Sequence, residues 1–387
     1  MIKFSRKIVM FMAALLLSLP VVALSPLSNE DMGAEAGQGL LVMDNIQGSN
    51  VTSGLGTGDW SGYTYTRMGL DVELSLNANI DKWQLGCGGF NEAIKANACD
   101  IDLDYVRLMG LDSSGTAPCS VSADATSSCY GGGDFVLTRP YIEIATKGSG
   151  ATREVVGIKI GAQNTNGYFG IGRNYASGQT NLENGGTCGS GTAALNCHSG
   201  INELSGYMHT EVSAAVPLSG LVSGSICFGH YTASAATGYG GDCASSAPYY
   251  TDIIGTRVNT LSLSSVKLNL TNGLLNTFGV TSAYAQLSEN LRFLHGFALN
   301  NTSDFSLSVQ REKISYPGYD GTTYSYPANV GWWMNVPNVQ AVNILGQPVN
   351  LSLSNAISAL AAPGTPLTDL ELNSVAPQNC WGTSKFC

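Results

Sequence analysis

Short stretches of alternating apolar and polar residues recur along most of the chain. The longest covers residues 70–80, where an apolar side chain occupies every second position, and others lie at 101–105, 141–144 and 305–309. Because the side chains of a β-strand point alternately to its two faces, this period of two predicts strands with one buried face. Residues 70–80 are therefore expected to form one long strand, and the chain as a whole to be built mainly from strands.

Two further segments predict strands that are joined by bends. Residues 155–161 and 168–172 are similar to a hairpin, because the segment 163–167 between them is rich in Asn and ends in Gly. Residues 261–270 contain five apolar positions with less regular spacing. That spacing predicts either a strand pair or one bent strand.

Helix signals are few. Ser28-Asn-Glu-Asp31 is similar to a capping box and Gly37 is a suitable stop, which predicts a helix of about two turns. Residues 283–297 and 351–361 are further helix candidates. The segments 181–200 and 233–246 are rich in Gly, Ser and Ala and contain cysteines, so they are expected to be surface loops held by disulfides.

Charged residues are only 12% of the chain and Gly is abundant, which favours many short strands and turns over surface helices. We therefore expect an all-β fold, an elongated multi-stranded sandwich or solenoid-like stack with short helices and disulfide-tied loops. The expected organisation is a signal peptide at 1–23, a short and partly helical leader at 24–48, and a β-rich body at 49–387. One large β domain or two smaller ones would fit this length.

The first 23 residues are typical of a secretory signal. Lys3, Arg6 and Lys7 precede an apolar run that ends at Pro20, and Ala23 provides a small residue for cleavage. No stretch is long enough to predict a membrane-spanning helix. Removing three basic residues from the 18 Lys and Arg leaves 15 against 28 Asp and Glu, a net charge of −13. Such an acidic chain is not expected to bind nucleic acid.

The cysteines support export. They are even in number, they fall as close neighbours, and the chain contains no C-x-x-C motif, so disulfides are favoured over zinc. Sequential pairing would close five short loops. The expected pairs are Cys87 with Cys99, Cys119 with Cys129, Cys188 with Cys197, Cys227 with Cys243, and Cys380 with Cys387.

The sequence offers little that is typical of catalysis. Its four histidines, His198, His209, His230 and His295, have no metal-binding spacing, and no nucleophile elbow, P-loop or dinucleotide motif is present. His198 next to Cys197 is the one suggestive pair, but a structural disulfide is favoured there over a reactive thiol. We expect neither an enzyme nor a cofactor.

Three aspartates, Asp100, Asp102 and Asp104, alternate with Ile101 and Leu103. Their spacing is similar to that of a calcium-binding loop, although the glycine that an EF-hand needs at its sixth position is missing. The alternation instead predicts that the carboxylates line the solvent face of one strand. Calcium binding by these three residues remains the minor alternative.

An aromatic cluster lies between residues 316 and 333 and is interrupted by prolines. Such residues form either a sugar- or protein-binding surface or, more often, the packed face or end of a sheet. The cluster consists of Tyr316, Tyr319, Tyr324, Tyr326, Trp332 and Trp333.

Several short blocks give the chain a resemblance to one group of exported gammaproteobacterial proteins, the pilus-system proteins of the FilA type, which are encoded with other envelope components. The blocks are residues 27–40, 86–89 leading to 99–104, 137–145, 153–160, 200–207 and 331–337. The resemblance implies a surface or pilus-associated role. It transfers no catalytic residue.

Three functions remain open from the sequence. The first is an exported structural, adhesive or assembly component of a pilus-like fibre, located at the cell surface or outside the cell. It would bind other pilus-system or envelope proteins, or a host or surface ligand, and open edge strands would be its mode of assembly. The alternatives are an outer-membrane β-barrel and a secreted hydrolase whose residues only the fold brings together.

Overall fold

A computed structural model describes most of the body of the chain. The described residues are 40–55, 58–112, 115, 133–189, 191–212, 214–219, 222–228, 249–273 and 282–341, with short pieces at 349–350, 366–368, 376–377 and 379. The chain divides into two units, Met1–Leu41 and Val42–Cys387, and the second holds almost everything described below. The predicted signal peptide, the helix near residue 28 and the helix candidate at 351–361 lie outside the described residues.

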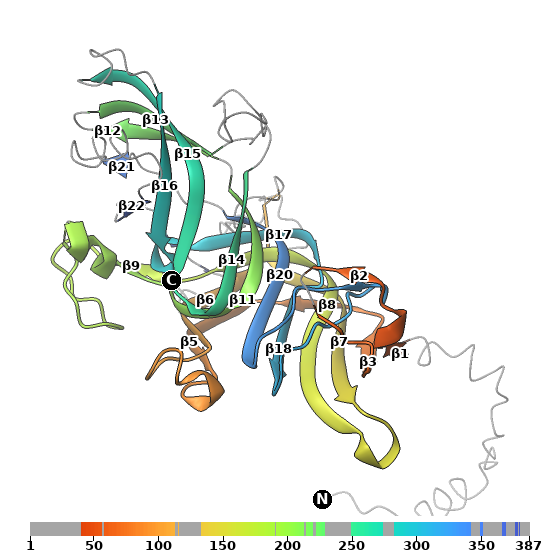
Figure 1. The fold of residues 1–387 in the computed structure, drawn as a ribbon. Helices are drawn as coiled ribbons and strands as arrows, with labels where there is room; N and C mark the ends of the chain where they lie inside the picture. The colour runs from red at the N-terminus through yellow and green to blue at the C-terminus, as the bar shows by residue number, and fades with distance from the viewer. Residues whose placement is uncertain are drawn as a thin grey trace, which may run out of the picture. The chain divides into compact units, whose positions relative to one another are not determined.

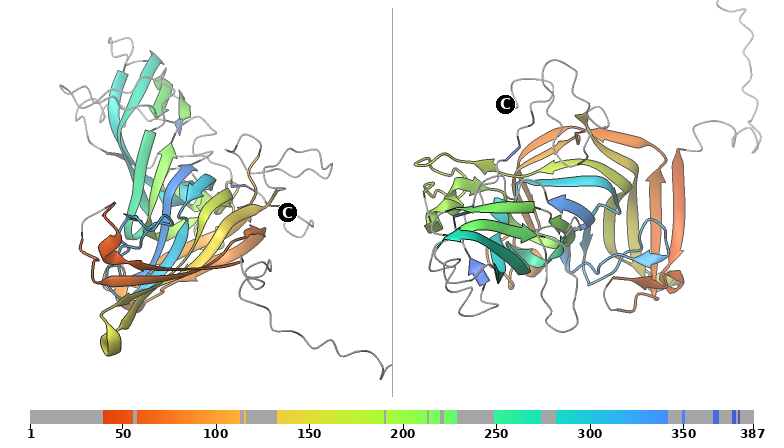
Figure 2. Two further views of the ribbon diagram at one scale, coloured as in Figure 1. Left: turned by 90° about the vertical axis from the view of Figure 1, so that its right-hand side faces the viewer. Right: turned by 90° about the horizontal axis from the view of Figure 1, so that it is seen from above.

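The described chain is almost entirely β, which confirms the predicted all-β fold class (Figure 1, and two further views in Figure 2). Twelve strands form one mixed sheet along the path β1–β3–β7–β8–β17–β20–β11–β6–β5, with β4, β14 and β18 paired beside it. These strands are β1 (Leu41–Gln47), β3 (Tyr63–Leu70), β4 (Glu73–Leu76), β5 (Ala78–Leu85), β6 (Ile101–Met109), β7 (Phe135–Lys147), β8 (Glu154–Gly170), β11 (Ile201–Val212), β14 (Tyr249–Val258), β17 (Gly296–Ser303), β18 (Ser306–Gln310) and β20 (Gly331–Ala341).

A second sheet has six strands in the order β21–β12–β13–β15–β16–β22. Its strands are β12 (Ala214–Ser219), β13 (Val222–Phe228), β15 (Thr260–Gly273), β16 (Ser282–Asn290), β21 (Val349–Asn350) and β22 (Pro366–Thr368). Two small pairs complete the strands, β2 (Ser53–Gly54) with β19 (Thr323–Tyr324) and β9 (Arg173–Asn174) with β10 (His198–Ser199). The described helical turns are all short 3-10 turns, η1 (Gly48–Asn50), η2 (Gly89–Asn91), η4 (Gly150–Thr152), η5 (Gly191–Cys197) and η6 (Leu291–Phe293).

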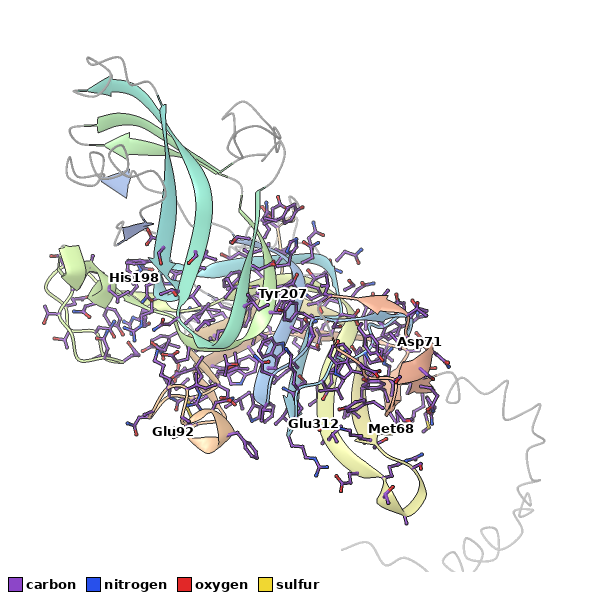
Figure 3. All side chains as sticks on the ribbon, viewed as in Figure 1. Met68, Asp71, Glu92, His198, Tyr207 and Glu312 are labelled. Atoms are coloured by element: carbon purple, nitrogen blue, oxygen red, sulfur yellow. A yellow bond between two sulfur atoms is a disulfide. The ribbon has the colours of Figure 1, made fainter. Side chains whose placement is uncertain are left out.

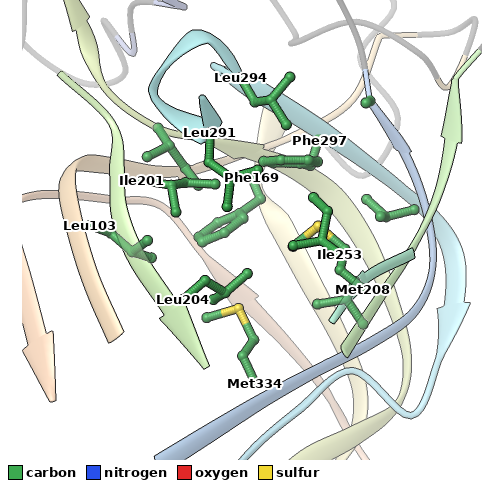
Figure 4. Packing of buried hydrophobic residues seen from close by; sticks show 14 of the residues in the cluster. Leu103, Phe169, Ile201, Leu204, Met208, Ile253, Leu291, Leu294, Phe297 and Met334 are labelled. Carbon is green, nitrogen blue, oxygen red and sulfur yellow. The ribbon is translucent and has the colours of Figure 1, made fainter. Parts of the chain in front are cut away.

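The large sheet closes a ring of paired strands. β8 pairs with β17, β17 with β20, β20 with β11 and β11 with β6, and β6 returns to β8 through Arg107↔Gly170 and Met109↔Tyr168. Every strand of this ring contributes to the main apolar core, in which Phe169 from β8 packs near Phe297 from β17 (Figure 4). The ring is therefore held both by ladder hydrogen bonds and by a shared core.

A second core is mostly aromatic. It gathers Tyr63 and Tyr65 from β3, Trp333 from β20, and Ile314 and Tyr316 from the segment 311–330 that follows β18. The hydroxyl of Tyr65 donates to the carbonyl of Ser315 at 2.6 Å. Segment 311–330 therefore covers one face of the strands that carry this core.

Tertiary pairing changes three of the predicted elements. The predicted strand 70–80 is wrong as a single strand, because β3 and β4 lie one after the other along β7 with a break at Asp71–Val72, and the chain then leaves for β5. The predicted hairpin at 155–172 is also wrong. Its turn residues stay extended within β8, since Thr165 pairs with Leu137 of β7 on one side and Thr302 of β17 on the other.

The helix predicted at 283–297 is a third error, because this stretch forms β16, η6 and the start of β17. Its sequence pairs along β15 from Thr260↔Asn290 to Asn269↔Ser282, so ladder pairing outweighs a weak helix propensity. The segment at 261–270 is one strand with a bulge between Leu263 and Val266, which fits the bent-strand alternative.

Two predicted disulfides are confirmed, Cys87–Cys99 and Cys188–Cys197. The predicted loop at 181–200 is tied by the second bridge and contains η5. Disulfides of this kind indicate an oxidising, extracytoplasmic environment. The partners of the other six cysteines, and the predicted loop at 233–246, lie outside what the structure describes.

Candidate functional site

The part of the large sheet formed by β3, β7 and β8 buries charged residues on one face. Arg67 lies opposite Glu143 in the register, and Glu143 lies opposite Lys159. These three side chains are 2%, 0% and 1% exposed. A charged row of this kind occupies the positions where an ordinary sheet carries its apolar core residues.

Two members of the buried row, Arg67 and Glu143, pair directly. The Arg67 guanidinium contacts Glu143 Oε2, with Nη2 at 2.6 Å and Nε at 2.8 Å. Its remaining N–H groups donate to the carbonyls of Gly318 and Tyr319 at 2.9 and 2.8 Å. Because guanidinium donors are fixed in a fork, this geometry ties the covering segment 311–330 to the sheet.

Lys159 is held between carbonyls and aromatic rings. Its ammonium donates to the carbonyl of Pro317 at 3.1 Å and lies 5.3 Å from the centre of the Tyr141 ring. Burial lowers the pKa of Lys159 and raises the pKa of Glu143, because both lose water around their charged forms. Among the described residues, Glu143 Oε1 has no hydrogen-bond partner.

The opposite face of the same strands is aliphatic. One row runs across the sheet as Met68↔Ile142, Ile142↔Ile160 and Ile160↔Leu307. Met68, Ile142 and Ile160 are 37%, 45% and 54% exposed, and Met68 is labelled in Figure 3. We call this surface the aliphatic face. Its members are Met68, Leu70, Ile142, Ile144, Val155, Ile158, Ile160, Leu307 and Val309.

The two faces follow from alternation. In Ile142-Glu143-Ile144 and Ile158-Lys159-Ile160 one type of residue must face inward and the other outward. Segment 311–330 covers the charged side, so the isoleucines are left facing solvent. The aliphatic row also continues into the main core, since Leu307 lies opposite Met334, which is 2% exposed. The aliphatic face is therefore an uncovered extension of the core.

Charges occur at the ends of these strands rather than within the aliphatic face. Arg139 pairs with Asp71 at one end, at 2.5 Å. At the other end Lys147 pairs with Glu312 at 3.1 Å, and Arg311 pairs with Glu154. Figure 3 labels Asp71 and Glu312. The arrangement has an apolar centre and polar ends, which is typical of protein interfaces.

The predicted acidic row does not lie along a solvent face. Ile101 and Leu103 are buried as expected, but Asp100 and Asp104 are also buried, at 3% and 0% exposure. Lys82 contacts both Asp102 and Asp104 at 2.6 Å. The expectation of a solvent-facing row is therefore wrong, because β11 and segment 86–99 cover this strand.

Every carboxylate oxygen of the acidic row has a protein donor. Besides Lys82, the donors are Arg257, Asn91 and the Trp332 backbone N–H for Asp100, Gln84 and Asn202 for Asp102, and Asn202 for Asp104. These bonds use the oxygens that calcium would need. No group of three or more His, Cys, Asp or Glu side chains among the described residues is placed to hold a metal ion.

Arg257 is an organising residue that the sequence pattern did not reveal. It is 4% exposed, and its Nε donates to Asp100 Oδ1 at 3.0 Å. Its other nitrogens donate to the carbonyls of Gly86, Gly88 and Lys95. Arg257 therefore holds the loop that the Cys87–Cys99 bridge closes. No element is predicted at this position from the sequence, and no local motif marks Arg257.

The predicted aromatic cluster mostly packs the second core. Tyr316 and Trp333 are buried at 3% and 2%, and Tyr319, Tyr324, Tyr326 and Trp332 are half-buried. Tyr326 stacks on Tyr207 with 4.8 Å between the ring centres. These contacts match the packing alternative for the cluster.

Two histidines meet in the interior. His198 Nδ1 and His295 Nε2 are 2.8 Å apart, and His295 Nδ1 donates to the carbonyl of Ile171 at 2.9 Å. Since a carbonyl only accepts, His295 carries its proton on Nδ1 and accepts from His198. Burial lowers the pKa of His198 to about 4 and that of His295 to about 3. Cys197, next to His198, is in a disulfide and offers no thiol.

The other described histidine, His209, lies near the surface. Its Nδ1 is 2.7 Å from Asp252 Oδ1, and its ring stacks on Tyr250 at 4.8 Å. The two residues His209 and Asp252 are directly opposite each other on β11 and β14. His230 lies outside the described residues.

Surface hollows occur among the described residues, and two of them have defined linings. One, of about 350 Å³, is lined by Asp71, Val72, Glu73, Thr138, Arg139, Gln163 and Asn164. The other, of about 360 Å³, is lined by Gly48, Ser49, Val51, Thr52, Gly54, Gly58, Asp59, Trp60, Ser61 and Tyr324. In the second hollow Gly58 packs so closely on the Trp60 ring that a Cβ there would lie 2.3 Å from it, so the ring is covered.

Comparison with known proteins identifies no relative. No family model matches the chain, and no curated protein or solved structure matches it significantly. None of the helical segments among the described residues has the length and apolarity needed to span a bilayer.

Proposed function

We propose that this protein is an exported component of a bacterial surface assembly, a structural, adhesive or assembly part of a pilus-like fibre that acts by binding. The observation that carries this proposal is the aliphatic face, with Ile142, Ile158 and Ile160 between 41% and 54% exposed in neighbouring strands. A contiguous exposed apolar surface of a few hundred Å² is about the size of the largest patch on a soluble monomer, and such patches are often interaction sites. Other pilus-system or envelope proteins are the expected partners.

The covalent structure supports the same proposal. Cys87–Cys99 and Cys188–Cys197 fit a protein that folds outside the cytoplasm. The charged residues that the sequence marked for possible chemistry serve instead to hold segments together, as Asp100 does with Arg257. These features favour a durable binding scaffold.

The aliphatic face is a better candidate for assembly than the edges of the sheet. The path of the large sheet begins at β1 and ends at β5, and β4 and β14 each pair with one strand beside it, so these four strands have an edge among the described residues. β4 carries Glu73 and β14 carries Asp252. β5 carries Asp81 and Lys82, and β1 carries Asp44, and charges on an edge oppose pairing with a foreign strand. The proposed contact is therefore through a sheet face.

The test is fractionation of whole cells combined with electron microscopy of sheared surface material, using an antibody to this protein. Label along or at the tips of shed filaments is expected. A protein recovered only from detergent-extracted membrane, with no label on filaments, would contradict the proposal. Recovery only as free protein in the culture medium would contradict it as well.

A further inference from the structure

We propose that the aliphatic face is a self-association surface, on which two copies of this chain pack sheet against sheet. The inference rests on the proposed function and names the partner. It begins from the composition of the face, which carries no ionisable group in its two central rows from Met68 to Leu307 and from Ile144 to Val309. Two such faces can meet without burying any charge.

The geometry of a sheet face suits a second sheet. Two sheets pack about 10 Å apart with their strands roughly aligned, and their side chains interdigitate. Ile142, Ile158 and Ile160 project from adjacent strands at matched register, so the surface is a regular array of branched side chains. A two-fold axis would bring the same array from both copies together, as in most symmetric dimers.

The size of the face sets the strength of the contact. Four strands about 4.8 Å apart, over the five residues of β18 at about 3.3 Å each, give roughly 320 Å² per copy, or about 640 Å² for a face-to-face pair. Standard interfaces begin at about 1,200 Å² in total. The dimer is therefore reversible, and it forms fully only where copies are concentrated, as they are in a surface assembly.

The charge of the chain argues against a lipid surface as the partner of the aliphatic face. The chain has a net charge of −10, and the basic residues Arg139, Lys147 and Arg311 at the strand ends are each paired with an acidic residue. Peripheral membrane surfaces instead combine apolar groups with unpaired basic residues that attract anionic lipids. A second copy needs no such charge.

The test uses the mature, disulfide-bonded protein and sedimentation velocity from about 1 to about 200 µM, a range that covers weak dimers. The double variant Ile142→Thr with Ile160→Thr keeps β-branched side chains and strand propensity but makes the centre of the face polar. We expect the wild type to dimerise reversibly, and the variant to bind itself on the order of tenfold or more weakly. Circular dichroism verifies that the variant is folded.

Matched controls are Ile94→Thr and Leu182→Thr, which change residues that are 62% and 73% exposed but lie outside the aliphatic face. Their dimerisation should equal that of the wild type. A wild type that stays monomeric across the range overturns the proposal, as does a dimer that the double variant leaves unchanged. Co-sedimentation of the monomer with phosphatidylcholine vesicles, abolished by the double variant, would assign the face to lipid and overturn it too.

The two proposals can fail separately. A protein that labels filaments but stays monomeric leaves the surface role intact and removes self-association. A protein that dimerises through the aliphatic face but is absent from surface material supports self-association and contradicts the surface role.

Discussion

At the scale of single residues, the row of Arg67, Glu143 and Lys159 places three ionisable side chains in the interior. Pairing compensates for the loss of water around each charge, and the carbonyls of segment 311–330 accept the donors that remain. Removing Arg67 or Glu143 breaks the buried ion pair and leaves the other member without it. The row is therefore a strong determinant of how that segment sits on the sheet.

Arg67→Met should destabilise the fold by about 3–5 kcal/mol, because it removes the ion pair and both guanidinium hydrogen bonds of the buried Glu143 carboxylate and leaves only the neighbouring Lys159 charge beside it. The measurement is urea denaturation with the disulfides intact. Arg139→Met, which breaks the exposed pair with Asp71, is the control and should have a far smaller effect. Equal losses in the two variants would show that the buried row is not specially stabilising.

The histidine pair makes stability depend on pH. His198 and His295 have pKa values of about 4 and about 3, below their ordinary value, because burial opposes their charged forms. An unfolded chain takes up protons on both rings near pH 6.5, whereas the folded chain does not. Their contribution to stability is therefore complete above about pH 6.5 and is lost as the pH falls toward 4 and then 3.

The urea midpoint of the wild type should fall across this window, and His295→Gln should show a shallower fall because it removes one of the two rings. Carboxylates contribute to acid unfolding in both proteins, so the difference between the two curves is the informative quantity. Parallel curves from pH 7 to about pH 4 would contradict the assignment of neutral, buried rings.

Sequence and structure agree best where alternation alone decides the outcome. Ile101 and Leu103 are buried as their pattern predicts, but Asp100 and Asp104 on either side of them are buried as well. Alternation tells which residues share a face, whereas only the tertiary partners decide which face is covered. Arg257, the partner of Asp100, is 157 residues away in the chain, so no local sequence pattern could predict this contact.

At the scale of elements, the same limit explains the wrong predictions. The Asn-rich centre of β8 has local turn propensity, yet β7 and β17 flank it and satisfy its backbone hydrogen bonds. The aliphatic face was also hidden from the sequence, because the alternation in 141–144 fits either orientation of the strand. Cysteine spacing was the more reliable local signal, since short loops leave few pairing choices.

The Cys87–Cys99 loop offers a test at this scale. Replacing both cysteines by alanine releases a loop with a sequence separation of 12, which costs about 3 kcal/mol in the chain-entropy model. Arg257 holds the same loop through three carbonyls, so Arg257→Met combined with the double alanine variant should be non-additive in urea denaturation. Additive losses would mean that the bridge and the arginine act independently.

At the scale of the whole molecule, net charge and the aliphatic face act in opposite directions on self-association. The whole chain carries a formal charge of −10, and without its predicted signal peptide it carries −13, so two copies repel one another at low ionic strength. The proposed contact buries apolar side chains, which salt does not screen. Contacts between the ion pairs at the strand ends would instead weaken in salt, because exposed charges are screened within about 8 Å at physiological ionic strength.

Raising the NaCl concentration should therefore leave dimerisation unchanged or strengthen it modestly, since it screens the repulsion and not the attraction. Sedimentation velocity of the wild type at low and high salt measures this directly. The Lys147→Gln variant, which removes one end charge paired with Glu312, should follow the same salt dependence. A dimer that dissociates as salt rises would be held by the charged residues at the strand ends, which contradicts the proposal. A contact made by Ile142, Ile158 and Ile160 has no charge for salt to screen.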